Sequence, residues 1–126
     1  MNKYGNRKTT TSDGVVHDSR LEASRWCELK LLERVGAIKD LRRQVELELI
    51  PAQYESFERY SKKGTRLKDG VKLVERKVSY VADFVYHDVE ANKMVVEDTK
   101  GFKTKDYKIK KKLMLWVHNI KITEVN

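Results

Sequence analysis

Two neighbouring β-rich segments carry acidic residues at positions where a buried strand normally carries apolar ones. The first is Tyr80–Phe84, with the sequence YVADF, and the second is Val95–Gly101, with the sequence VVEDTKG. Burying carboxylates in an apolar sheet is costly unless an opposite charge compensates them. A divalent metal together with a phosphate supplies that compensation. The two segments therefore predict a site at which a metal ion and a phosphate meet.

The alternation of side chains along regular strands groups the charged residues of this site. It places Asp83 on one face of the first strand, with Ala82 and Phe84 on the other. In the second strand it places Asp98 and Lys100 together.

The turn between the two strands sets their register. A two-residue turn at 90–91 would set Asp83 opposite Asp98, and one at 91–92 would set it opposite Lys100. Both registers keep the three side chains on one face, whereas a three-residue turn or a bulge would separate them.

Opposed carboxylates repel each other unless a cation lies between them. Mg²⁺ suits such a pair, because it takes one or two carboxylates and keeps waters for a substrate phosphate. We expect Asp83 and Asp98 to bind Mg²⁺, with Mn²⁺ able to substitute. Lys100 would then neutralise charge that builds on the phosphate and orient the attacking water.

Glu22 is a third carboxylate with two possible roles. Residues 19–22, SRLE, fit a capping box, in which Glu22 caps the helix backbone and needs no other role. The same glutamate precedes Trp26 and Leu29 on one side of the helix, so it could instead face the sheet.

The order of predicted elements indicates a single α/β domain over residues 1–126, roughly (β)αβββαβ, with a mixed sheet flanked by helices. Residues 1–11 are expected to form a flexible arm. A small hairpin is predicted from 8–11 and 15–17, a helix from about 19 to Gly36, a strand at 44–50, and polar loops at 52–70. Strands are further predicted at 71–86, 93–99 and 120–125, and a second helix at about 104–118.

Helical spacing also predicts which residues form the core. The first helix would bury a stripe of Ala23, Cys27, Leu31, Leu32 and Val35, widened by Trp26 and Leu29, with Cys27 as a reduced core residue. In the second helix the corresponding apolar stripe is Ile109, Leu113, Trp116 and Val117.

The net charge of +8 and a pI of about 9.5 favour a polyanionic partner. The candidate DNA-binding residues are Lys103, Lys105, Lys108, Lys111, Lys112, Lys62 and Lys63. Few acids interrupt the run of lysines that begins at Lys100, although a solvated helix face is the alternative reading. The chain has neither a signal peptide nor an apolar run of membrane-spanning length, so we expect a soluble, cytoplasmic protein.

At residues 19–22, 80–84 and 96–101 the chain resembles the PD-(D/E)XK nuclease superfamily. It resembles more closely a family of small bacteriophage proteins that begin with Asn-Lys-Tyr-Gly, here residues 2–5, and it is similar to phage junction-resolving endonucleases. The resemblance implies a restriction-endonuclease-like core and a metal-dependent DNA endonuclease. It assigns Glu22, Asp83 and Asp98 as metal-site acids and Lys100 as the catalytic lysine. The chain departs from the superfamily at Ala82, where a proline is common, and the adjacent Glu97 leaves open which acid aligns with the motif.

The resemblance further implies a Holliday junction resolvase acting on branched DNA in phage recombination or packaging. Because a resolvase cuts two strands symmetrically, we expect a homodimer. No membrane contact and no small-molecule cofactor are expected. One alternative is a nicking or end-processing nuclease of the same fold. The other is a non-catalytic nucleic-acid-binding protein, in which Asp83 and Asp98 are structural.

Overall fold

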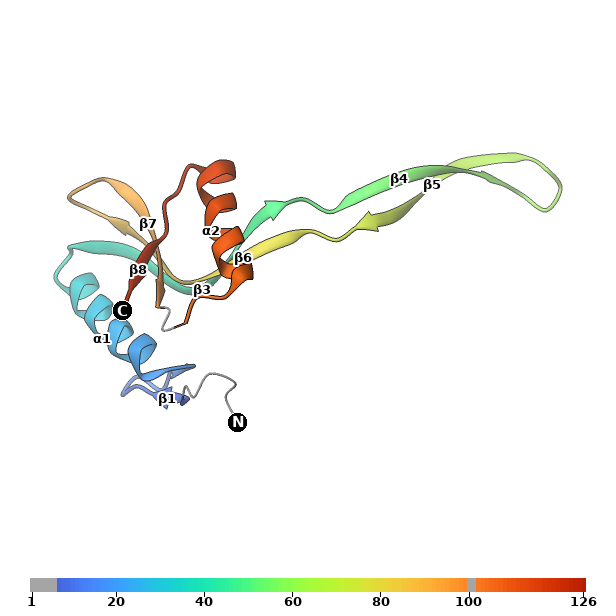
Figure 1. The fold of residues 1–126 in the computed structure, drawn as a ribbon. Coiled ribbons are helices and arrows are strands. Elements are labelled where there is room, and N and C mark those ends of the chain that lie inside the picture. The colour runs from blue at the N-terminus through green and yellow to red at the C-terminus, as the bar shows by residue number, and fades with distance from the viewer. Residues whose placement is uncertain (1–6, 100–101) are drawn as a thin grey trace.

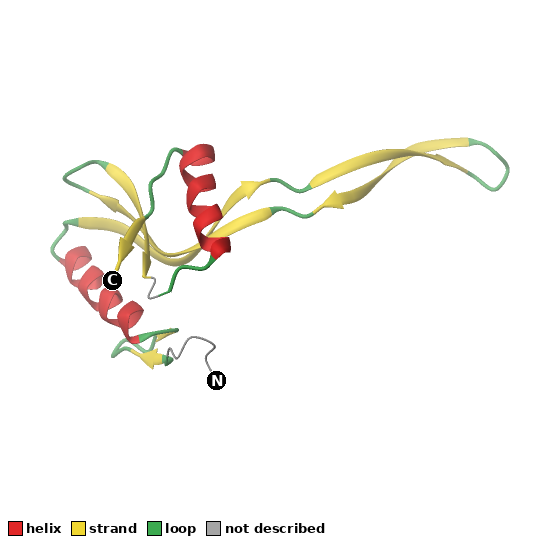
Figure 2. Ribbon diagram, viewed as in Figure 1, coloured by secondary structure: helices red, strands yellow, loops and turns green. Residues whose placement is uncertain are grey.

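The computed structural model of the chain describes residues 7–99 and 102–126, and it has a mixed α/β architecture (Figures 1 and 2). The elements follow one another as β1 (Thr9–Thr10), β2 (Val16–His17), α1 (Arg20–Arg34), β3 (Ile38–Ile50), β4 (Gln53–Tyr60), β5 (Arg66–Glu75), β6 (Val78–Asp88), β7 (Lys93–Thr99), α2 (Lys105–His118) and β8 (Thr123–Val125). No helix in the described part of the chain is long and apolar enough to span a membrane.

The central sheet has the strand order β3-β6-β7-β8, antiparallel except for the parallel pair of β7 and β8. One apolar cluster joins Tyr80 and Ala82 of this sheet to Tyr107 and Met114 of α2. A second cluster joins strand residues such as Phe84 to Trp26 and Leu29 of α1. The sheet therefore carries one helix on each of its apolar sides, as the predicted mixed sheet flanked by helices requires.

The regular alternation predicted for residues 80–86 is wrong. Ala82 and Val85 pack in the α2 cluster, whereas Phe84 packs in the α1 cluster, so the facing pattern changes beside Asp83. The neighbouring strand explains this, because Gln44 lies across from Asp83 and has a left-handed φ of 53°. A left-handed residue inside a strand interrupts the pleat, and side chains on either side of it change face.

The first helix begins and ends as predicted and buries one part of the predicted arc. The Ser19 side chain caps its N-terminus, and Gly36 follows its end with a φ of 81°. Ala23, Trp26 and Leu29 are buried, as predicted, and Trp26 stacks on Phe84 of the sheet. Cys27 is exposed, so its predicted core position is wrong. The helix is rotated relative to the predicted stripe, with the Trp26 ring on the Phe84 ring at the contact.

The second helix shows the same kind of rotation. It begins after Thr104, as predicted, and ends at Asn119 in the left-handed conformation. Tyr107 and Met114 are buried against the sheet, whereas Trp116, predicted to be in the core, is 86% exposed. Tyr80 of β6 packs against Tyr107 and selects this face.

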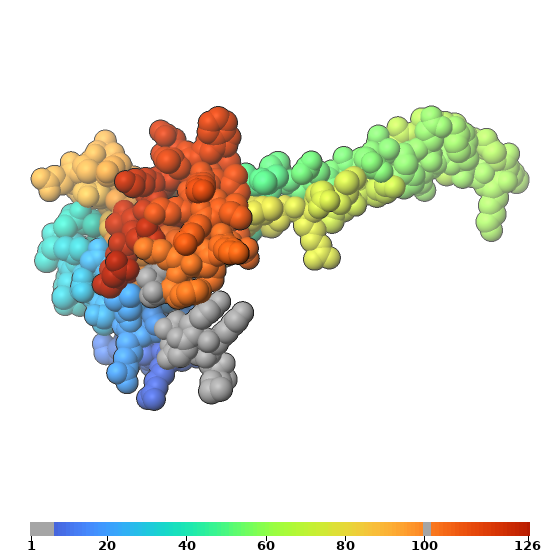
Figure 3. Space-filling view, in the orientation of Figure 1, coloured from blue at the N-terminus to red at the C-terminus, as the bar shows by residue number. Residues whose placement is uncertain are grey.

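Residues 53–75, which the sequence predicted in large part as polar loops, form a two-stranded antiparallel hairpin of β4 and β5. We call this hairpin the ribbon; it extends away from the central sheet (Figures 1 and 3). Lys62 and Lys63 lie in the turn at its tip. The segment predicted as one strand over 71–86 is two strands, β5 and β6, separated at Arg76–Lys77.

The remaining predicted strands are present with changed or unchanged bounds, and the strand predicted at 120–125 is confined to Thr123–Val125. Strand β7 has the predicted bounds, and the N-terminal hairpin forms from Thr9–Thr10 and Val16–His17. Strand β3 begins at Ile38, six residues before the predicted start. Phe84 pairs with Glu97. Of the two predicted registers, this is the one that sets Asp83 opposite Asp98.

Candidate active site

Glu22 faces the sheet from the first turn of α1. Its backbone N–H donates to the Ser19 hydroxyl at 3.1 Å, which is one half of the predicted capping box. Its carboxylate does not complete the box but turns inward, and the residue is only 3% exposed. Of the two roles that the sequence left open, the structure favours a side chain that faces the sheet.

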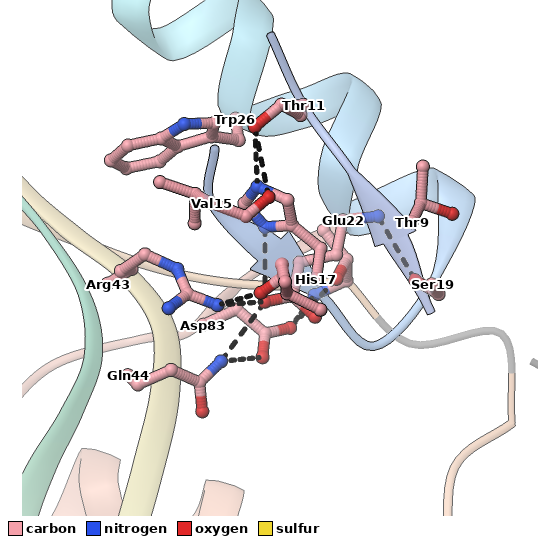
Figure 4. A network of polar contacts seen from close by, with 12 residues as sticks. Thr9, Thr11, Val15, His17, Ser19, Glu22, Trp26, Arg43, Gln44 and Asp83 are labelled. Carbon is pink, nitrogen blue, oxygen red and sulfur yellow. Dashed lines mark hydrogen bonds and ion pairs between the residues drawn. The ribbon is translucent and has the colours of Figure 1, made fainter. Parts of the chain in front are cut away.

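One amide links Glu22 to Asp83, the acid of β6. The Gln44 side-chain nitrogen donates to Glu22 Oε1 at 3.1 Å and to Asp83 Oδ1 at 3.5 Å (Figure 4). The left-handed backbone of Gln44 is the same irregularity that interrupts the pleat beside Asp83. Two carboxylates from distant parts of the sequence thus meet at a single amide group.

The other oxygen of Asp83 is fixed by the end of β7. Asp83 Oδ2 accepts hydrogen bonds from the backbone N–H and from the hydroxyl of Thr99, both at 2.8 Å. Thr99 directly follows Asp98 in the sequence. These two bonds hold Asp83 in one orientation at the point where the second acidic segment begins.

The electrostatic environment of Glu22 disfavours its charged form. Burial raises the pKa of the Glu22 carboxyl, and the negative charge of Asp83 raises it further. Arg43 opposes these effects, with its guanidinium Nη2 3.6 Å from Glu22 Oε1. A bound cation would act in the same direction as Arg43, because it favours the ionised carboxylate.

His17 forms the wall behind Glu22. It is fully buried, with Nδ1 3.8 Å from Glu22 Oε1 and Nε2 3.4 Å from the Thr11 hydroxyl. Burial lowers the pKa of the His17 imidazole, and the nearby Arg43 guanidinium lowers it further. The buried imidazole covers this side of the Glu22 carboxylate.

The N-terminal hairpin is attached to α1 beside this wall. Asp13 accepts a hydrogen bond from the Trp26 indole N–H at 2.7 Å, and it also accepts from the Thr11 hydroxyl and the Val15 backbone. These donors, the Thr11 hydroxyl first, lower the pKa of Asp13 to about 2. The hairpin thereby holds His17 against Glu22.

Asp98 occupies a different environment. It is fully buried, and its Oδ2 accepts a hydrogen bond from the Tyr80 hydroxyl at 2.9 Å. Burial raises the pKa of Tyr80, and the charge of Asp98 adds to that shift. Tyr80 belongs to the α2 cluster, and the charge of Asp83 also raises its pKa. The structure thus brings Glu22 and Asp83 together, and Asp83 and Asp98 both act on Tyr80.

Glu97, the other acid of the pair, anchors α1 to the sheet. Arg25 of α1 donates to both of its oxygens, Nε to Oε1 and Nη2 to Oε2, each at 2.7 Å. The Tyr86 hydroxyl also donates to Oε2. Glu97 is fully buried, so this bidentate pair compensates a charge inside the core. Lys100 lies outside the described residues, and its catalytic role stays a prediction.

Among the described residues, no group of three or more His, Cys, Asp and Glu side chains is arranged to hold a metal ion. Mg²⁺ does not require such a group, since one or two carboxylates with substrate phosphates suffice. The hard oxygen donors of Glu22 and Asp83, and the raised pKa of Glu22, fit this mode of binding. These two residues would hold the ion.

The predicted DNA-binding lysines lie in two separate places. Lys108, Lys111 and Lys112 of α2 share a groove with Lys121 of the following loop, and the rest of its lining is Leu115 and Ile122. Lys105, at the start of α2, does not line this groove. Lys103 and Lys111 also form ion pairs with Glu124 of β8, at 3.3 and 2.5 Å. Lys62 and Lys63 are at the tip of the ribbon, which points away from the site (Figure 3).

Sequence reasoning missed the residues that position the two acids. Gln44, Arg43, His17 and Thr99 each contact Glu22 or Asp83. A polar glutamine within an alternating strand is the only local signal for any of them, and it gives neither a partner nor a left-handed φ.

A search of curated proteins and a search of solved structures both gave no match to the chain. One family model matches residues 1–125, and its description is a protein of unknown function, DUF1064. Because the match spans almost the whole sequence, the chain belongs to the DUF1064 family.

Proposed function

We propose that this protein is a Mg²⁺-dependent DNA endonuclease that hydrolyses phosphodiester bonds. The observation that carries the proposal is the meeting of Glu22 and Asp83 at the Gln44 amide, next to the end of the strand that bears Asp98. This juxtaposition of a helix glutamate with a strand aspartate supports the role that the nuclease resemblance assigns to both.

Each residue has a distinct part in the proposed reaction. Glu22 and Asp83 bind the metal, and Gln44 and Thr99 keep the two carboxylates in position. The bound ion supplies Lewis-acid stabilisation of the phosphate and lowers the pKa of a water nucleophile. Lys100 is proposed to neutralise the developing charge on the phosphate, and Asp98 is proposed as the third acid.

Branched DNA is the proposed substrate, and a Holliday junction is the preferred form. The lysine-lined groove on α2 offers several cations to a phosphate backbone. Each lysine that neutralises a phosphate of duplex DNA should steepen the salt dependence of binding by a slope of about −0.9. Simultaneous cutting of two strands of a junction requires two active sites, hence the proposed homodimer.

Cleavage of labelled substrates tests the proposal. Wild type and the Glu22→Gln, Asp83→Asn, Asp98→Asn and Lys100→Ala variants are compared on a four-way junction, a linear duplex and single strands, with Mg²⁺, Mn²⁺ or EDTA. We expect metal-dependent junction cutting by the wild type and losses of about 100-fold or more in the first two variants. Glu28→Gln is the matched control, because Glu28 is an exposed acid of the same helix.

The outcomes separate the candidates. Absence of cutting by fresh wild-type protein on every substrate would remove the enzyme hypothesis. Equal rates on junction and duplex would remove the resolvase while keeping a nuclease of nicking or end-processing type. Titration with Mn²⁺, measured by calorimetry, provides a readout other than activity. Glu22→Gln should weaken Mn²⁺ binding, and Glu28→Gln should not.

A non-catalytic nucleic-acid-binding protein is the second candidate. It is favoured by the hydrogen bonds that already engage two of the acids, from Thr99 to Asp83 and from Tyr80 to Asp98. In that case the acids stabilise the fold. Junction binding without cutting, and destabilisation rather than loss of metal affinity in Asp83→Asn, would support it.

A further inference from the structure

The ribbon exposes both of its faces. Every residue of β4 is exposed, and all of β5 is exposed except the half-buried Gly70. Its charged residues are partly matched within the ribbon, as in the 2.9 Å pair of Lys72 with Glu55. A two-stranded hairpin without a covering layer is only marginally stable in water. The ribbon therefore lacks the packing layer that the central sheet receives from its helices.

The accessible surface of the chain is large for its mass. A compact chain of 14.8 kDa is expected to expose about 7,000 Å². This chain exposes 9428 Å². The excess, roughly 2,400 Å², is similar to the area that one subunit buries in a large obligate interface, about 1,000–2,500 Å².

One face of the ribbon carries an apolar patch beside Ser56, which pairs with Val71. Tyr54 pairs directly with Leu73, and Val71 lies two residues from Leu73 on the same strand, so the three side chains share a face. Each is about half exposed or more, and Val71 reaches 67%. We call these three residues the ribbon patch. Such a patch is typical of a surface that contacts another protein.

The outer side of α2 carries a matching apolar stripe. Ile109 and Trp116 are seven residues apart and lie on one face of the helix, opposite the buried Tyr107 and Met114, with Lys112 of the lysine-lined groove between them. Both are mostly exposed, and Trp116 is the most exposed large apolar side chain of the described residues. A tryptophan with this exposure is a typical interface anchor.

We infer that a second copy of this chain covers both surfaces, with the ribbon patch of one subunit packed on the Ile109–Trp116 stripe of the other. Two copies related by a two-fold axis would bury each surface twice, because such an interface is reciprocal. The apolar character of both surfaces favours a protein partner over a nucleic acid, whose contacts are polar and cationic. The ribbon also projects away from the rest of its own chain (Figure 3).

This inference rests on the homodimer of the proposed function and names its interface. Its test is separate from cleavage, since the dimer would form without DNA or metal. Sedimentation equilibrium in EDTA measures the mass of wild type, Val71→Lys, Trp116→Glu and the control Val35→Lys. Val35 is an exposed apolar residue beside α1, outside both surfaces. We expect wild type and Val35→Lys to have twice the 14.8 kDa chain mass. Val71→Lys and Trp116→Glu should raise the dimer dissociation constant by about tenfold or more.

Mixing the two interface variants is the sharper test. In a heterodimer of Val71→Lys with Trp116→Glu, one ribbon–helix contact keeps both native surfaces, and the other pairs a lysine with a glutamate. We therefore expect the equimolar mixture to dimerise more strongly than either variant alone. A symmetric ribbon-to-ribbon or helix-to-helix interface would not give this recovery.

Several results would overturn the inference. A monomeric wild type at 100 µM would do so, as would unchanged dimerisation of Val71→Lys or a mixture no stronger than its components. If the variants instead lose affinity for a DNA duplex while all proteins stay monomeric, the ribbon is a nucleic-acid-binding element. Circular dichroism melts verify that both variants fold, since their altered side chains are exposed in the monomer.

Discussion

Removing Arg25 from its ion pair with the buried Glu97 should strongly destabilise this chain. Replacing Arg25 by Met keeps much of the side-chain volume but leaves the fully buried Glu97 with Tyr86 as its hydrogen-bond donor among the contacts described above. Removing one partner of a buried pair costs about 3–5 kcal/mol. The corresponding decrease in melting temperature is about 10–20 °C for a chain of this size.

Urea denaturation monitored by circular dichroism provides the measurement. With a slope of roughly 2 kcal/mol per molar urea, Arg25→Met should lower the midpoint by about 2 M. Glu28→Gln is the internal control, because Glu28 pairs with the same arginine but its side chain is 61% exposed. An exposed pair contributes at most about 1 kcal/mol, so its midpoint should barely move.

A double variant tests the physical reason for the loss. Adding Glu97→Gln to Arg25→Met removes the uncompensated charge and keeps an acceptor for the Tyr86 hydroxyl. We expect the double variant to be more stable than Arg25→Met by about 1–3 kcal/mol. If Arg25→Met loses less than about 1 kcal/mol, or if the second substitution gives no recovery, the charge of Glu97 is not what Arg25 compensates.

Three further outcomes follow from the same contacts. The pKa of Glu22 is raised in the folded state, so the stability of the wild type should fall as pH rises from 4.5 toward the folded-state pKa. Thermal melts between pH 4 and 8 measure this, and at pH 7 Glu22→Gln should be more stable than the wild type. The pKa of Asp13, lowered from 3.8 to about 2, gives stability that is present above pH 3.8 and lost as pH falls toward 2, so acid titration of Asp13→Asn should lack this step. Gly70→Ala would place a methyl carbon 2.3 Å from the Phe57 ring, so hydrogen exchange should accelerate across the ribbon and not in β6, and Phe57→Leu should relieve the effect.

Local signals in the sequence were sufficient to predict where several elements begin. Ser19 and Thr104 each accept a hydrogen bond from a backbone N–H three residues later, and both helices begin directly after them. The β-branched run of β7 gave its bounds correctly. These features depend on neighbours within one turn of the chain, which is why the sequence alone predicts them.

The faces of the helices could not be predicted in the same way. The most apolar stripe of α2 contains Ile109 and Trp116, yet the helix buries Tyr107 and Met114 instead. Periodicity identifies an apolar face, but the contact with Tyr80 and the rest of the sheet decides which face is used. The inferred second subunit would explain why α2 has two apolar faces, because the sheet would cover one and the second subunit the other.

The candidate site was predicted in part. Glu22 and Asp83 were both named from the sequence, and the structure brings them to one amide. Gln44 was not named, because its role depends on a left-handed φ that the sequence does not signal. The same irregularity changes the facing of the residues after Asp83, which the alternation of a regular strand could not predict.

The course of the backbone through the ribbon has a mechanical consequence. Strand β3 runs into β4 after Pro51, and β5 returns into β6 across only two residues. A load applied at the hairpin tip would therefore travel along the two strands that carry Gln44 and Asp83. Tension or twist in these strands would change the distance between the Glu22 and Asp83 carboxylates, which both contact Gln44.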